Sequence, residues 1–257
     1  MGLGVTWRLV NASEVGTSHV SVGRPCEDSS WASVDRTSAG VDVLSIFVAD
    51  GAGSAAKGGE GAELAVQTAA AYMAEKLAQA KFGCSDEMAV EMVIGIRTQI
   101  QAAAEAANLT PRDFACTLLG VVSSKLGTLV LQIGDGGIVI DVGSGLEVPV
   151  VPMSGEYANM THFVTDEDAV TKLVTRVYPT VASRVAAFSD GLQRLALNMG
   201  DNTAHAPFFT PFFNVLSKAT PEQEDELHAA LVRFLSSPSV NERTDDDKTL
   251  ALAALVS

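Results

Sequence analysis

Carboxylate side chains recur in one local pattern, in which an acidic residue borders a short apolar segment. The acidic sites are Glu27-Asp28, Asp50-Gly51, Asp135-Gly136, Asp190-Gly191 and Asp245-Asp246-Asp247. A single Asp-Gly pair is most often a turn. Carboxylates that converge repel one another unless protons or cations neutralise them, and all-oxygen ligand sets suit Mg²⁺ or Mn²⁺ rather than zinc. The pattern therefore indicates a site for hard divalent cations, provided that the five segments meet in the fold.

A second motif overlaps the first of these Asp-Gly pairs. Residues 51–56 (GAGSAA) follow a predicted strand, precede a predicted helix and fit the G-x-G-x-x-[GA] fingerprint of dinucleotide-binding proteins. Asp50, however, stands directly before the first glycine, where its charge would repel a pyrophosphate. The predicted helix also leads into another helix rather than into a strand that carries a ribose-binding acid. We therefore do not favour a nucleotide-dependent oxidoreductase.

The charge balance limits the classes of partner. The chain has 257 residues, with 17 Lys or Arg against 31 Asp or Glu, and a formal net charge of −14. This excess of acid argues against nucleic acid and anionic membrane as partners, because both require a basic face. The three cysteines, Cys26, Cys84 and Cys116, show no C-x-x-C spacing, which favours a reducing compartment. Since no signal peptide or membrane-spanning run is apparent, we expect a cytoplasmic protein.

The elements that must position the acids alternate in type along the chain. The predicted strands cover residues 41–49, 114–123, 128–133, 138–142, 181–188 and 248–256. The predicted helices cover residues 60–81, 87–108 and 221–236. Connections of hairpin length at 125–127 and 134–137 predict that the strands on either side are antiparallel neighbours. This order predicts an α+β fold in a single domain, residues 1–257.

One segment is unusual because four phenylalanines lie within seven residues. Residues 207–213 (PFFTPFF) also contain two prolines. We expect an irregular segment that buries the four rings against the core. A patch for docking a partner is the alternative.

Five short motifs occur in the order typical of one enzyme family. They are GTSH with PCED (16–19 and 25–28), VADGAGS (48–54), IGDGG (133–137), FSDGL (188–192) and DDKT (246–249). The chain resembles the metal-dependent type 2C (PPM) Ser/Thr protein phosphatases. It is most similar to the small bacterial branch with a GEYANxTHF segment, here residues 155–163. The resemblance implies an α-β-β-α sandwich, in which two stacked antiparallel sheets carry a helix pair on each outer face.

The resemblance also implies a set of metal ligands, for two or possibly three Mn²⁺ or Mg²⁺ ions. Asp50 would bridge two ions, and Asp135 would hold a third, weaker ion. The other ligands are Glu27, Asp28 and the Gly51 carbonyl on one ion, and Asp190 and Asp246 on the other. Asp247 occupies a place where the family has Asn. Two adjacent cations lower the pKa of a shared water, so that hydroxide attacks phosphorus in line without a covalent intermediate.

Two departures from the family pattern concern the predicted catalytic residues, Asp50, Arg24 and His19. Many members have a His, proposed as the proton donor, where this chain has Ala52. A metal-bound water, His19 or His162 would then donate the proton. Arg24 lies one residue nearer to the Glu-Asp pair than the phosphate-binding Arg of the family, whose place is taken by Gly23. A planar guanidinium suits a phosphate dianion.

Residues 152–163 fall where bacterial members carry a flap over the metal site. The segment is either a surface loop with Tyr157 and Phe163 packed inward or a contact for substrate. We predict hydrolysis of phosphoserine and phosphothreonine on proteins, the products of a Ser/Thr kinase. The alternative is a catalytically silent relative that binds phosphoproteins as a regulatory module.

Overall fold

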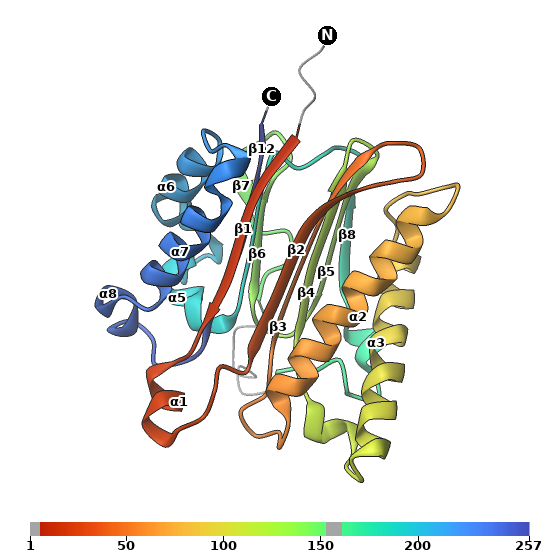
Figure 1. The fold of residues 1–257 in the computed structure, drawn as a ribbon, viewed down its shortest axis with the longest axis vertical. Coiled ribbons are helices and arrows are strands. Elements are labelled where there is room, and N and C mark those ends of the chain that lie inside the picture. The colour runs from red at the N-terminus through yellow and green to blue at the C-terminus, as the bar shows by residue number, and fades with distance from the viewer. Residues whose placement is uncertain (1–5, 153–160, 257) are drawn as a thin grey trace.

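Two five-stranded antiparallel sheets lie face to face at the centre of the molecule (Figure 1). The computed structural model describes residues 6–152 and 161–256. Helices cover the outer face of each sheet, so that the layers run helix, sheet, sheet, helix. A buried apolar cluster fills each of the three spaces between layers. The predicted α+β sandwich is therefore confirmed.

The first sheet joins the two ends of the described chain. Its strands, in spatial order, are β1 (Thr6–Glu14), β12 (Lys248–Val256), β9 (Arg184–Phe188), β6 (Gly137–Asp141) and β7 (Leu146–Glu147). Strands β1 and β12 pair over nine residues, from Thr6 opposite Val256 to Glu14 opposite Lys248. The chain that leaves β1 therefore lies beside the acidic segment that enters β12.

The second sheet contains the long buried strands. Its strands, in spatial order, are β2 (Asp28–Arg36), β3 (Asp42–Asp50), β4 (Leu118–Ser124), β5 (Gly127–Ile133) and β8 (Val174–Tyr178). The predicted hairpin at 125–127 is confirmed, because β4 and β5 pair directly. The predicted hairpin at 134–137 is wrong, because β5 and β6 lie in different sheets. Both strands are apolar on both faces, so the length of their connection did not reveal that it crosses between sheets.

The helices divide between the two faces. The second sheet is covered by α2 (Gly58–Ala78) and α3 (Asp86–Ala106). The first sheet is covered by α5 (Gln193–Ala196), α6 (Ala206–Leu216), α7 (Glu224–Leu235) and α8 (Pro238–Asn241). Shorter elements are α1 (Thr17–Val22), α4 (Ala169–Lys172), β10 (Leu197–Asn198), β11 (Thr203–Ala204) and the 3₁₀ turns Pro111–Phe114, Asp190–Leu192 and Pro221–Gln223. No helix in the two described ranges is long and apolar enough to cross a bilayer.

The phenylalanine-rich segment is helical, which corrects the prediction of an irregular segment. It forms most of α6, where Pro207 falls in the first turn and loses no helical hydrogen bond. The spacing of four residues places Phe209 and Phe213 on one buried face. Phe208 and Phe212 are half-buried and contact Phe234 of α7. The rings therefore join α6 and α7 to the sheet, as the packing part of the prediction required.

Candidate active site

A cavity of about 230 Å³ opens where the connections between strands meet at one end of the sandwich. Its acidic lining residues are Asp50, Asp135, Asp190, Asp246 and Asp247. They come from the end of β3, the β5–β6 connection, the turn after β9 and the segment before β12. Gly51 and His19 also line this cavity, and Ala52 lies beside them. Four acidic segments that are distant in sequence therefore meet in one place.

Asp28 and Asp50 face each other across the β2–β3 pair. One carboxylate oxygen of Asp28, Oδ2, accepts hydrogen bonds from Ser189 Oγ (2.7 Å) and Thr249 Oγ1 (2.8 Å). Within the described part of the chain, its other oxygen, Oδ1, is buried without a hydrogen-bond partner. Burial raises the pKa of Asp28 to about 7, although these two hydrogen bonds partly offset the shift. An acid that resists ionisation in this way lacks a compensating positive charge.

Burial also raises the pKa values of Asp50 and Asp190. Burial raises the pKa of Asp50 well above its usual value, and repulsion from Asp28, Asp190 and Asp246 adds to the shift. Burial likewise raises the pKa of Asp190 to about 6, with repulsion from Asp135 and Asp246 as further causes. The site thus concentrates negative charge that its own residues do not neutralise.

The backbone that presents Asp50 is fixed from the neighbouring strand. The Asp50 N–H donates to Thr117 Oγ1 (3.0 Å), and the Asp50 carbonyl accepts from the Thr117 N–H (2.8 Å). Gly51 donates its N–H to the carbonyl of Glu27 (3.1 Å). A side chain at position 51 would overlap the backbone of Gly58. The glycine of this Asp-Gly pair therefore permits a close approach between two segments of the chain.

Asp135 is held by side chains from two other segments. Its Oδ2 accepts a hydrogen bond from Thr161 Oγ1 (2.6 Å), and its carbonyl accepts from the amide of Gln193. Thr161 and Phe163 line the cavity. They end the predicted flap segment, whose residues 153–160, including Tyr157, lie outside the described residues. The part of this segment that is described thus contacts the acidic site.

Arg24 and Glu27 form an ion pair at the edge of the site, in which one guanidinium nitrogen contacts both carboxylate oxygens. The Arg24 Nη2 atom lies 2.8 Å from Glu27 Oε1 and 2.7 Å from Oε2. A second hydrogen bond runs from Arg24 Nη1 to the Gly53 carbonyl (3.2 Å). Neither Arg24 nor Glu27 is among the residues that line the cavity. The structure therefore places these two predicted site residues beside the acidic cluster and in contact with each other.

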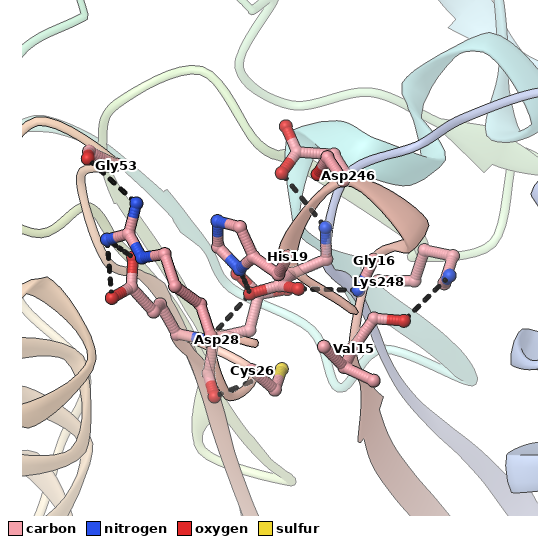
Figure 2. Close-up of polar contacts among 12 residues, drawn as sticks. Val15, Gly16, His19, Cys26, Asp28, Gly53, Asp246 and Lys248 are labelled. Atoms are coloured by element: carbon pink, nitrogen blue, oxygen red, sulfur yellow. Dashed lines mark hydrogen bonds and ion pairs between the residues drawn. The ribbon is translucent and has the colours of Figure 1, made fainter. Parts of the chain in front are cut away.

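Asp247 is a buried residue that connects three segments, and its contacts are drawn in Figure 2. Its Oδ1 accepts the backbone N–H of Gly16 (2.6 Å), and its Oδ2 accepts the N–H of Glu27 (2.6 Å). His19 Nδ1 lies 3.0 Å from the same Oδ2. Sequence reasoning identified Asp247 only as the occupant of a family Asn position. The contact with His19 joins the β1–α1 region to the start of β12 and has no local sequence signal.

Lys248 anchors the same corner through different partners. Its buried side chain donates from Nζ to Asn241 Oδ1 (2.8 Å) and to the Val15 carbonyl (3.2 Å). Burial lowers the pKa of Lys248. The two consecutive residues 247 and 248 therefore fix the turn that carries Gly16, as Figure 2 shows.

The two candidate proton donors differ in location. His19 lines the acidic cavity. His162 instead lines a neighbouring cavity of about 980 Å³, and its Nδ1 lies 3.8 Å from Asp166 Oδ2. The structure thus separates two histidines that the sequence left as equal alternatives.

The acidic residues have the chemistry that a divalent cation requires. Asp28 Oδ1 and Asp190 Oδ1 are buried and, among the described residues, unpartnered, and the candidate ligands are all oxygen atoms. Within the same ranges, no three His, Cys, Asp or Glu side chains are arranged to bind one ion as they stand. The residues therefore fit a hard cation, with side-chain rotation on binding.

Comparison with known proteins identifies the class. A sequence profile described as Protein phosphatase 2C matches residues 15–236. The chain belongs to the protein phosphatase 2C family. It is 59% identical over 249 residues to serine/threonine-protein phosphatase 3 of Escherichia coli (strain K12), a match that covers 97% of this chain and 98% of that relative.

Solved structures share the fold at low sequence identity. A crystal structure of a bacterial serine phosphatase has a TM-score of 0.62 at 13% identity, covering 97% of this chain and 98% of the other. The catalytic domain of the phosphatase PstP, in complex with two manganese ions, has a TM-score of 0.60 at 15% identity, covering 99% and 100%. These matches support the α-β-β-α architecture.

Proposed function

We propose that this chain hydrolyses phosphoserine and phosphothreonine on proteins, with Mn²⁺ or Mg²⁺ as cofactor, as one domain spanning residues 1–257. One observation carries the proposal: acids from four separate segments meet in a cavity and leave buried carboxylate oxygens unpartnered. Membership of the protein phosphatase 2C family and the relative named serine/threonine-protein phosphatase 3 support the same activity.

Two ions, and possibly a third, would be held by the acidic residues and one backbone carbonyl. The proposed ligands are Glu27, Asp28, Asp50, Gly51, Asp135, Asp190 and Asp246. When bound, the cations supply a hydroxide nucleophile near neutral pH and offset charge on the phosphoryl oxygens. Asp50 would serve both principal ions, which is consistent with its place among Asp28, Asp190 and Asp246. Asp135 would hold the weaker third ion.

Arg24 would bind the substrate phosphate. Its Nη2 atom already contacts both carboxylate oxygens of Glu27, and a phosphate dianion also offers paired oxygen acceptors to a guanidinium. Substrate and Glu27 therefore compete for this group, or share it through its remaining N–H donors. Binding of a cation to Glu27 would free the guanidinium for substrate.

His19 would donate the proton to the leaving oxygen. Ala52 lines the same cavity and provides no donor, and His162 lies in the neighbouring cavity. A serine alkoxide is a poor leaving group, so its protonation in the transition state accelerates the reaction. His19, which lines this cavity, would be the imidazole that supplies this proton.

The substrates would be phosphoproteins made by a Ser/Thr kinase, in the cytoplasm. The net charge of −14 disfavours nucleic acid and anionic membrane as partners. The catalytically silent alternative is not favoured, since the acids expected to hold metal are all present in the sequence.

Turnover of p-nitrophenyl phosphate and of a phosphoserine peptide tests the proposal. We expect activity with Mn²⁺ or Mg²⁺, none with chelator, and restoration when metal is added back. Asp190→Asn is the test variant at the acidic site. Its control is Glu75→Gln, which removes one negative charge from an exposed position of α2 and should keep full activity. Metal-loaded protein that binds the phosphopeptide but hydrolyses neither substrate would instead support the regulatory module.

A further inference from the structure

We propose that Asp247 is a positioning residue that holds the His19 ring in the orientation needed for proton transfer to the leaving oxygen. This inference rests on the proposed phosphatase activity and adds a residue to it. The contact between Asp247 Oδ2 and His19 Nδ1 (3.0 Å) joins two residues on the wall of the same cavity.

The contacts of Asp247 require a group that only accepts hydrogen bonds. Two backbone N–H groups, from Gly16 and Glu27, point at its two oxygens, each at 2.6 Å. His19 Nδ1 approaches one of those oxygens as a third potential donor. An Asn would turn its NH₂ group toward one of the backbone N–H donors and leave that donor unsatisfied. The Asp that stands in a family Asn place therefore matches what surrounds it.

Burial strengthens the electrostatic interaction between the Asp247 carboxylate and the His19 ring. The side chains of His19 and Asp247 are 14% and 4% exposed. A charge pair interacts more strongly where water is largely excluded. The Nδ1 atom is within ion-pair distance but lies off the line of a good hydrogen bond. Catalytic hydrogen bonds are often misaligned in ligand-free enzymes and tighten in the substrate complex.

Two departures from the family pattern meet at this contact. Ala52 removes the usual histidine, and Asp247 replaces the usual asparagine, yet both residues line the cavity that contains His19. Among the described residues that line it, His19 is the one histidine. Asp247 therefore contacts the one described imidazole that could take the place of the missing donor.

The proposed proton step balances as follows. The Nε2–H bond of protonated His19 breaks while the proton forms a bond to the serine oxygen. The P–O bond to serine breaks at the same time as the attacking hydroxide forms its own bond to phosphorus, so serine leaves with the electron pair on its oxygen and the phosphoryl group leaves as inorganic phosphate. The ring becomes neutral and keeps its proton on Nδ1, facing Asp247.

Leaving-group dependence tests the inference with His19→Ala, Asp247→Asn and the double variant. Each variant is scored at saturating Mn²⁺ by the ratio of its rate on a phosphoserine peptide to its rate on p-nitrophenyl phosphate, because p-nitrophenolate needs no proton to leave and any disturbance at Gly16 or Glu27 lowers both rates. This ratio should fall about 10²–10⁴-fold in His19→Ala, the range of general acid catalysis. It should fall about 10–100-fold in Asp247→Asn, and no further in the double variant than in His19→Ala. His162→Ala is the matched control and should lose nothing selectively.

Equal loss of Asp247→Asn on both substrates, or extra loss of the double variant beyond His19→Ala, would overturn the inference, as would a selective loss in His162→Ala. A second measurement needs no variant. In the wild type, ¹⁵N NMR should find neutral His19 protonated on Nδ1, and a proton on Nε2 instead would refute the role of Asp247. Wild-type protein inactive on both substrates would refute the proposed function itself, whatever the tautomer.

Discussion

Asp50→Asn separates the catalytic charge of this site from its contribution to folding. Asn keeps the volume of Asp and one acceptor oxygen, but it cannot bridge two dications. We therefore expect phosphatase activity to fall by at least ~10³-fold, the scale expected when a metal-generated nucleophile is lost.

The same change should stabilise the metal-free protein at pH 7. Asp50 is repelled by three acids, Asp28, Asp190 and Asp246. At up to ~1 kcal/mol for each like-charge contact, the relief amounts to about 1–3 kcal/mol. For a chain of this size, each kcal/mol changes Tm by about 2–4 °C. The expected increase in Tm with chelator present is thus roughly 2–12 °C.

The pH dependence has a definite sign. Below the usual Asp pKa of 3.8, position 50 is uncharged in both the folded and unfolded wild type, so the two proteins should melt alike. As pH rises above this value, the unfolded state ionises freely while the raised pKa of Asp50 resists ionisation in the folded state, and the wild type loses stability. The difference in Tm between Asp50→Asn and the wild type should therefore increase as the pH rises.

Melting curves from pH 4 to 8 with chelator, and Mn²⁺-dependent turnover of the same preparations, measure both effects. Glu75→Gln is the control for loss of one charge and should follow the wild type in both. An active, metal-responsive Asp50→Asn enzyme would refute the bridging role. A metal-free variant that melts below the wild type at pH 7 would show that Asp50 supports the fold.

Four further substitutions address three separate parts of the molecule. Asp135→Ala should lower the rate mainly at low Mn²⁺, whereas Asp190→Ala should abolish it at all concentrations; equal losses insensitive to metal would place Asp135 with the essential pair. Gly16→Ala should raise the Mn²⁺ concentration needed for half-maximal rate and lower Tm, because its Cβ would overlap the backbone of Asp246; unchanged metal dependence would show that this turn is not coupled to the site. Phe209→Ala should destabilise by about 3–5 kcal/mol in denaturant titrations while the folded fraction keeps its rate, and a cost below about 1 kcal/mol would contradict its packing role.

The sequence predicted those elements whose character is local. Strands such as β3 are continuous apolar runs, and α3 begins after Ser85, whose hydroxyl accepts the N–H of Met88. Strand β2 was not predicted, because its residues DSSWASVDR are polar and partly exposed. Edge strand β8 was not predicted for a similar reason, because it is partly exposed along its length. Both strands are specified by their neighbours in the sheet rather than by their own sequences.

At the candidate active site, the sequence likewise predicted residues that have a local signal but not the contacts that the fold creates. Asp-Gly pairs at strand ends indicated Asp50, Asp135 and Asp190 without any knowledge of the fold. The ion pair between Arg24 and Glu27, three residues apart, was within reach of the sequence but was not anticipated. The contact between His19 and Asp247 could not be predicted from the sequence, because it depends on the pairing of β1 with β12. Only tertiary structure connects those two residues.

The position of β12 has a consequence during synthesis of the protein on the ribosome. This strand pairs with β1 on one side and β9 on the other, and Asp246 and Asp247 directly precede it. While residues 246–256 remain in the exit tunnel, β1 lacks its partner, and the acids of the earlier segments lack the residues that complete the cavity. We therefore expect a chain that lacks residues 246–256 in the fold to have no phosphatase activity.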